Sequence, residues 1–201
     1  TDNVTNDSTP DFTGTAEAGV TVALMEGTTV LGQTTAAGDG SWTITSSLLA
    51  DGVHNVVARA TDQAGNQSLS ASLEVTIDTA NPAAPGVALT NDTGSSGSDR
   101  ITSDGALTLT GIEADALVEY SIDAGAHWTG SFTAVEGENA VQVRQTDVAG
   151  NVSDAASFSF TLDTIAPVPD AGSDRSVDEG DETTLTGSFT DEGVGPYTRI
   201  W

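Results

Sequence analysis

The strongest constraint on the fold is a motif that occurs twice at a fixed distance. The pattern TDxAGNxS begins at Thr61 and again at Thr146, and a DTxxP segment follows each copy, at Asp78 and at Asp163. Both pairs of segments are 85 positions apart. A constant internal period of this length predicts two tandem copies of one domain. Tandem arrays bind or bridge more often than they catalyse.

Hydrophobic residues alternate with polar ones, which is the period of a β-strand. Segments 73–78 and 158–163 both show this alternation, and the strands before them put Arg59 and Arg144 on the face opposite their apolar residues. Short strands recur every 8–12 residues or so, separated by Gly, Asn and Asp clusters. The predicted fold class is therefore all-β, with tandem immunoglobulin-like β-sandwiches.

The repeat also sets the predicted domain boundaries. The first domain covers residues 1–80, a proline linker covers 81–85, and the second domain covers 86–164. Residues 165–201 break the repeat and are too short for a core of their own, so they are predicted to be the truncated N-terminal part of a third sandwich. Proline fixes the backbone φ angle, and the linker is therefore expected to be a semi-rigid spacer.

The charge balance is strongly acidic. Thirty acidic residues face five basic ones, all Arg, for a net charge of -25. Nucleic acid and anionic membrane surfaces are not expected partners, because both need cationic side chains, whereas bound cations would relieve the self-repulsion. No apolar run is long enough for membrane insertion, and the chain opens on polar residues without a signal peptide, as expected for an internal segment of a longer protein.

The chain contains no cysteine. This excludes disulfides, thiolate metal sites and thiol catalysis, and it fits a bacterial surface or secreted origin better than a secreted eukaryotic one.

The two matching tryptophans are predicted to fill the sandwich cores. Trp42 lies in a Ser-Trp-Thr context and Trp128 in a His-Trp-Thr context. A carbohydrate-stacking role is the alternative, but aromatic residues make up only 5% of the chain and do not cluster. His54 and His127 fall at strand positions away from the Asp-rich loops, and we expect them to be structural or exposed.

Three acidic elements are predicted to converge if the chain follows immunoglobulin topology. The hairpin loop with Asp147 and Asn151 would lie at the N-terminal pole of the second copy and face the end of the first copy, where Asp78 lies. The connecting loop between the copies carries Asp92 and Asp99 at its ends.

Several carboxylates in one site repel one another and raise one another's pKa, and a bound hard cation offsets this repulsion. Calcium takes six to eight oxygen ligands in a flexible site, whereas zinc would favour His or Cys. The alternative is that each Asp or Asn only caps its own turn. A related half-site in the first copy and the start of a further junction would use Asp2, Asp7, Asp62, Asn66, Asp163, Asp170 and Asp174.

With DTGxSxxDxIT over residues 92–102, the repeated motifs resemble the bacterial Ig-like repeats of giant secreted adhesins of the RTX and biofilm-associated type. The resemblance covers residues 1–164, and residues 168–201 resemble the start of a PKD-type module. It implies a stalk of tandem sandwiches at the bacterial cell surface, secreted by a type I route and stiffened by interdomain Ca²⁺.

The metal ligands that the resemblance implies are Asp78, Asp92, Asp99, Asp147 and Asn151. The repeat adds Asp62, Asn66 and Asp163 as candidate ligands at neighbouring junctions. The partners would be adjoining Ig-like repeats of the same chain and calcium, while another part of the parent protein would bind the adhesive target.

The predicted function is thus a structural extender. The alternatives are a ligand- or glycan-binding adhesive module and an Ig/PKD-like spacer of a secreted hydrolase. Catalysis is not expected, because the sequence has no Cys or Lys, no nucleophile elbow and no phosphate-binding glycine loop. The carboxylate pairs Asp178/Glu179 and Asp191/Glu192 fit solvated turns better than a glycosidase site.

Overall fold

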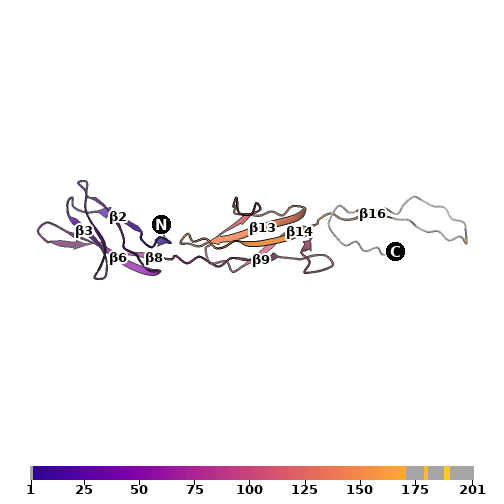
Figure 1. Cartoon of the computed structure of the whole chain (residues 1–201), viewed down its shortest axis with the longest axis horizontal. Helices are drawn as coiled ribbons and strands as arrows, with labels where there is room; N and C mark the ends of the chain where they lie inside the picture. The colour runs from indigo at the N-terminus through magenta and orange to yellow at the C-terminus, as the bar shows by residue number, and fades with distance from the viewer. Residues whose placement is uncertain (1, 171–178, 181–187, 191–201) are drawn as a thin grey trace. The chain divides into compact units, whose positions relative to one another are not determined.

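The computed structural model describes residues 2–170, 179–180 and 188–190 (Figure 1). Every regular element among them is a β-strand, which confirms the predicted all-β fold class. In this part of the chain there is accordingly no helix that could cross a membrane. One compact unit comprises residues 1–83, 113–117 and 145–153, and the other comprises 84–112, 118–144 and 154–201.

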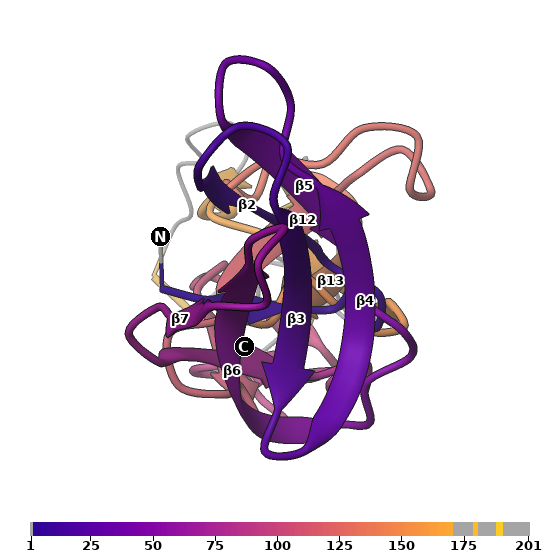
Figure 2. The same cartoon turned by 90° about the vertical axis from the view of Figure 1, so that its left-hand side faces the viewer.

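The first unit contains two sheets that face each other. The larger sheet has the strand order β1-β8-β6-β3-β4. Along β6, the first half pairs with β8 and the last three residues pair with β7. The smaller sheet pairs β2 with β5, and Figure 2 shows it beside the row of β4, β3 and β6. The strands are β1 Val4–Thr5, β2 Asp11–Thr15, β3 Thr21–Glu26, β4 Thr29–Thr35, β5 Ser41–Thr45, β6 Gly52–Thr61, β7 Gln67–Leu69 and β8 Leu73–Ile77.

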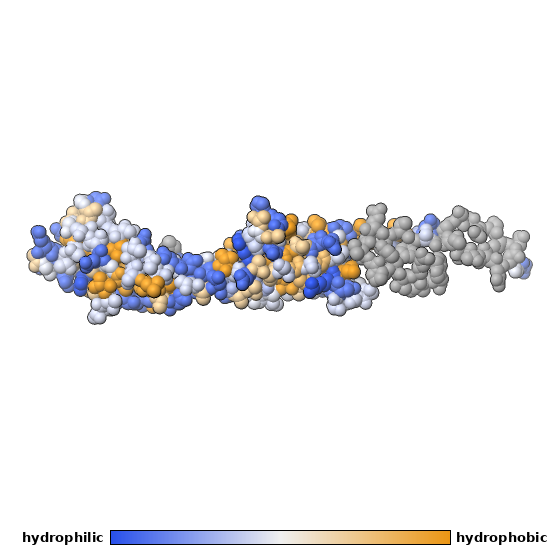
Figure 3. All heavy atoms as spheres, viewed as in Figure 1, coloured by the Kyte–Doolittle hydropathy of each residue, from blue (hydrophilic) through white to orange (hydrophobic). Residues whose placement is uncertain are grey.

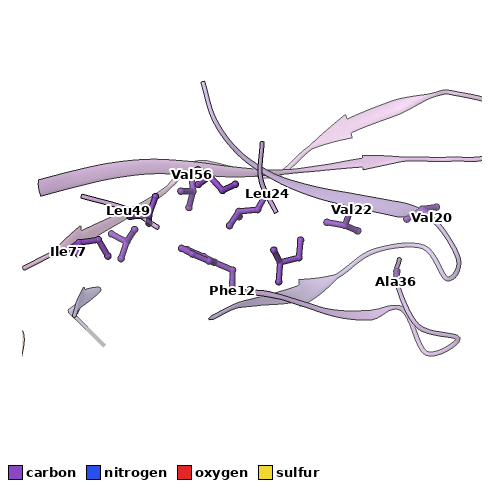
Figure 4. Close-up of a cluster of buried hydrophobic side chains, with 11 residues drawn as sticks. Phe12, Val20, Val22, Leu24, Ala36, Leu49, Val56 and Ile77 are labelled. Carbon is purple, nitrogen blue, oxygen red and sulfur yellow. The ribbon is translucent and has the colours of Figure 1, made fainter. Parts of the chain in front are cut away.

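The core of this unit forms where the apolar faces of the two sheets meet. Phe12 points from β2 towards Leu24 of β3 and Val56 of β6 (Figure 4). Trp42 is partly buried against this cluster, as predicted, and Gly14 leaves the space for its ring. A Cβ atom at Gly14 would lie 2.4 Å from Trp42 Cζ2, so any larger residue would displace the ring.

The second unit has a similar plan with fewer strands in its larger sheet. Its larger sheet has the order β10-β14-β13-β12, and its smaller sheet pairs β11 with β9, which also lies beside β14. The strands are β9 Gly86–Leu89, β10 Ile101–Thr102, β11 Leu107–Thr110, β12 Leu117–Ser121, β13 Gly137–Thr146 and β14 Ala156–Leu162. A separate pair joins β15 Val168–Asp170 to β16 Ser188–Thr190.

The core of the second unit uses phenylalanine where the sequence pattern predicted tryptophan. Val143 and Phe160 are buried, and the Phe132 ring meets Phe160 edge-on at 6.3 Å. Trp128 instead lies under the guanidinium of Arg144, 4.1 Å from its ring centre. Val143 is buried in the core, so the side chain of Arg144, the next residue of β13, lies on the opposite face of the sheet. Trp128 packs against Arg144 on that face, and the prediction of a core role for Trp128 is therefore wrong.

The predicted PKD-like segment is described only in part. Asp170 ends β15 and Glu179 lies in a turn. Asp174, Asp178, Asp191 and Glu192 lie outside the described residues.

Hydrophilic residues are spread over the visible face of both units, with small apolar patches between them (Figure 3). This distribution fits the net charge of -25.

His54 ties β6 to β3 and to the loop before it. Its Nδ1 lies 2.9 Å from Glu26 Oε1, and its Nε2 lies 2.8 Å from the Ala50 carbonyl oxygen. Both partners accept hydrogen bonds, so the doubly protonated ring fits best. The bond to Ala50 raises the pKa of His54 above its usual 6.5; burial opposes this shift and Glu26 adds to it.

We therefore expect the His54 ring to titrate above pH 6.5 in an NMR titration of the full chain. A raised folded-state pKa means that the stabilisation is complete below the unfolded-state value and is lost as the pH rises through the folded-state value. Glu26→Gln should lower the midpoint, whereas Glu17→Gln, at an exposed position, should leave it unchanged. A midpoint at or below 6.5 would contradict the assignment.

Candidate functional site

The two copies of the repeated motif form the same closed loop. In each, the Asp carboxylate accepts hydrogen bonds from the backbone N–H and the side-chain amide of the Asn four residues later, at 2.7–2.8 Å. The glycine between them, Gly65 or Gly150, has φ of 88° or 96°, a conformation that glycine adopts without strain. These loops bring together Asp62 with Asn66 and Asp147 with Asn151, as the spacing predicted.

Both loop carboxyls have pKa values below their ordinary range. For Asp62 the main cause is the hydrogen bond from the Asn66 side chain, which lowers the pKa. For Asp147 burial acts most strongly and raises the pKa, but the bonds from Asn151 and from the loop N–H groups together outweigh it. Both groups therefore carry a negative charge at neutral pH.

Asn151 differs from Asn66 in its surroundings. Asn66 is exposed, whereas Asn151 is buried, and its Nδ2 also donates to the backbone oxygen of Asp78 at 2.8 Å. In the same compact unit, Asn6 N–H donates to the Ala149 carbonyl at 3.2 Å. Asp78 thus meets the Asp147–Asn151 loop through its backbone, while its own carboxylate accepts from Ala80 N–H at 3.0 Å.

Gln145 is a site residue that the sequence pattern did not single out. Its side chain is fully buried; Nε2 donates to the Ala83 carbonyl at 2.8 Å, and Oε1 accepts from Glu113 N–H at 2.9 Å. It stands 85 positions after Ala60, at an inward-facing position of β13. A polar residue where the first copy has alanine was the available signal.

The Asp92 loop contains a buried carboxylate oxygen with no partner. Asp92 Oδ2 accepts from Arg100 N–H at 3.1 Å, but no described group donates to its Oδ1, which is shielded from solvent. Asp99 Oδ1 accepts from Ile101 N–H at 3.0 Å. A buried carboxylate oxygen without a donor is unfavourable unless a cation or a water molecule satisfies it.

The remaining predicted ligands cap their own turns. Backbone N–H groups two residues further on donate to Asp2, Asp7 and Asp163, at 3.3, 2.8 and 3.2 Å. Across residues 2–170, 179–180 and 188–190, no three Asp, Glu or His side chains come together in a group that could hold a metal ion. Any cation here would need backbone carbonyl and amide oxygens besides carboxylates.

Comparison with known proteins identifies a domain family. The model of the bacterial Ig-like domain matches residues 1–79 and 80–164. Comparison with curated proteins gives no match.

Three solved structures resemble the chain at low identity. The fibronectin(III)-like modules of Clostridium thermocellum CbhA are 19% identical, with 80% of this chain and 92% of that one covered and a TM-score of 0.43. The BSP domain of a biofilm-associated protein is 15% identical (79% and 28% covered, TM-score 0.29). A Ca²⁺-stabilized adhesin with which an Antarctic bacterium binds ice is 23% identical (80% and 46% covered, TM-score 0.39). The chain therefore spans less than half of each of the last two chains.

We expect Asn151→Ala to destabilise the protein more than Asn66→Ala. The first change removes the buried side-chain donor to the Asp78 carbonyl and to one oxygen of the Asp147 carboxylate, for a loss of about 2 kcal/mol in the free energy of unfolding. The second removes exposed bonds, for about 0.5 kcal/mol. Urea unfolding followed by circular dichroism measures both, and equal losses would show that the burial of Asn151 has no energetic consequence.

Proposed function

Because the chain belongs to the bacterial Ig-like domain family, we propose that it is a structural extender segment of a large bacterial surface adhesin, stiffened by calcium at its domain junctions. The role is non-enzymatic. The adhesive target would be bound elsewhere in the parent protein, and this segment would hold that part away from the cell.

The observation that carries the proposal is the anchoring of the linker. Ala83 lies in the middle of the linker, and its carbonyl accepts from the buried side chain of Gln145. Pro82 and Pro85 are buried, and their rings fix the backbone φ angle at both positions. A linker fixed by proline rings and a buried amide suits a spacer that must keep its length, whereas a flexible tether would be solvated.

The Gln145 anchor can be tested without calcium. Gln145→Met keeps a similar volume but loses both hydrogen bonds, so we expect faster proteolytic cleavage within residues 81–85 and a loss of about 1–3 kcal/mol in the free energy of unfolding. Gln142→Met, on the outward face of the same strand, is the matched control. Cleavage at the wild-type rate would argue against an anchored linker.

Calcium fits the donor chemistry of the loops. The unpartnered oxygen of Asp92 can accept a cation, and the proposed ligands Asp78, Asp92, Asp99, Asp147 and Asn151 carry carboxylate or amide oxygen atoms. Asp62, Asn66 and Asp163 would serve neighbouring junctions in the same way. When bound, the ion would supply positive charge to loops of a chain whose net charge is -25.

Calcium binding should be detectable by calorimetry and by the melting temperature. Extracellular calcium modules have dissociation constants of roughly 0.1–1 mM, and calcium at about a hundredfold excess over this constant stabilises the folded state by about 2.7 kcal/mol per site. We expect chelation to lower the melting temperature and to broaden the distance distribution in small-angle scattering.

Asp92→Asn should weaken calcium binding roughly tenfold or more, because it removes the unpartnered charged oxygen. Asp39→Asn is the matched control, since Asp39 only caps the turn at Ser41. Identical titrations of wild type and Asp92→Asn would exclude Asp92 as a ligand, and no calcium response in the wild type would overturn the calcium part of the proposal.

A further inference from the structure

A groove runs along one side of the first unit, between the smaller sheet and the β7 end of the larger sheet. It has a volume of about 610 Å³, and its floor reaches core residues of β3 and β6. The side chains that the argument uses are Phe12, Trp42, Ala58, Ala60, Leu69 and Leu73. The small side chains of Ala58 and Ala60 leave this space open.

Both walls of the groove end in strand edges. Among the described residues, β2 pairs only with β5 and β7 only with β6. Leu69 is 66% exposed and Leu73 is 44% exposed, so apolar side chains line the rim. An unpaired edge with apolar side chains beside it is a template for an added strand.

The second unit shows what covers this position. There β9 pairs antiparallel with β11 and also lies beside β14, so it closes the side between the two sheets. In this part of the two units, corresponding residues are 97 positions apart: Val4 of β1 corresponds to Ile101 of β10, and Gly14 corresponds to Gly111. By the same spacing, β2 is the counterpart of β11.

The register gives the position of each side chain on such a strand. Val87 of β9 stands opposite Leu109 of β11, and the counterpart of Leu109 in the first unit is Phe12. Val87 and Leu89 are half-buried, whereas Gly86 and Ala88 are exposed. An equivalent strand on β2 would therefore turn two apolar side chains into the groove.

We propose that this groove is a docking site for a β-strand of the Gly-Val-Ala-Leu type, joined ahead of β1 as β9 is joined ahead of β10. The strand runs antiparallel to β2, uses its free backbone groups, and covers Leu69 and Leu73. The first domain is thus a sandwich completed by an added strand, and the site recognises alternating apolar side chains. This inference is independent of calcium.

The test adds a copy of residues 84–97 ahead of Thr1, which reproduces the spacing of the second unit. We expect hydrogen exchange of the β2 amides at residues 11–15 to slow roughly tenfold or more and the melting temperature of this domain to rise by roughly 5 °C. The control extension carries Val87→Asp and Leu89→Asp in the added copy and should give neither effect.

A second variant tests the groove itself. Leu69→Lys with Leu73→Lys changes exposed positions, so the fold should persist while the benefit of the added strand is lost. Equal exchange at residues 11–15 with the apolar and the Asp-containing extension would overturn the proposal. A concentration-dependent dimer of the unextended chain that the Lys variant abolishes would also overturn it, because the occupant would then be a second copy.

Discussion

The Asp–Asn closure of the last hairpin is the interaction on which much of this structure depends. In both copies one carboxylate accepts from the backbone and the side chain of an asparagine four residues later, which fixes a short loop without any help from the rest of the sheet. The strands that flank it are then held in register from one end. In the second copy the same asparagine is buried and has a further acceptor, the Asp78 carbonyl, so a local turn also becomes a tertiary contact.

The sequence pattern predicts elements whose determinants are local. Alternation over 73–77 and the Gly-Asn turn at 65–66 predict strands and a hairpin, because side-chain period and backbone conformation depend on near neighbours. Trp128 shows the limit of this reasoning. It matches Trp42 in its local context, but the segment before it is shorter than in the first copy. Arg144 of β13 lies over its ring and provides a favourable cation–π partner.

The candidate site was predictable as a set of residues but not as an arrangement. Each carboxylate of the repeated motifs accepts from its own turn, as with Asp78 and Ala80 or Asp163 and Ile165. Sequence spacing reports these short-range bonds well. It cannot report that one Asp92 oxygen is buried without a donor, because that depends on how the loop over residues 92–102 folds back on itself. Gln145 was missed for a related reason, since its partners, Ala83 and Glu113, are distant in sequence.

The linker and the closing strand of the second domain are one continuous piece of chain. Gly86, the first residue of β9, follows Pro85 directly, so tension along the backbone enters the domain through β9. The four residues of β9 pair side by side with β11, and such a ladder resists a pull along the strand by loading its hydrogen bonds together. A sandwich closed by the strand that follows its linker therefore couples the anchoring of Ala83 to the integrity of the next core. The proposed role as a spacer of fixed length would require such a coupling.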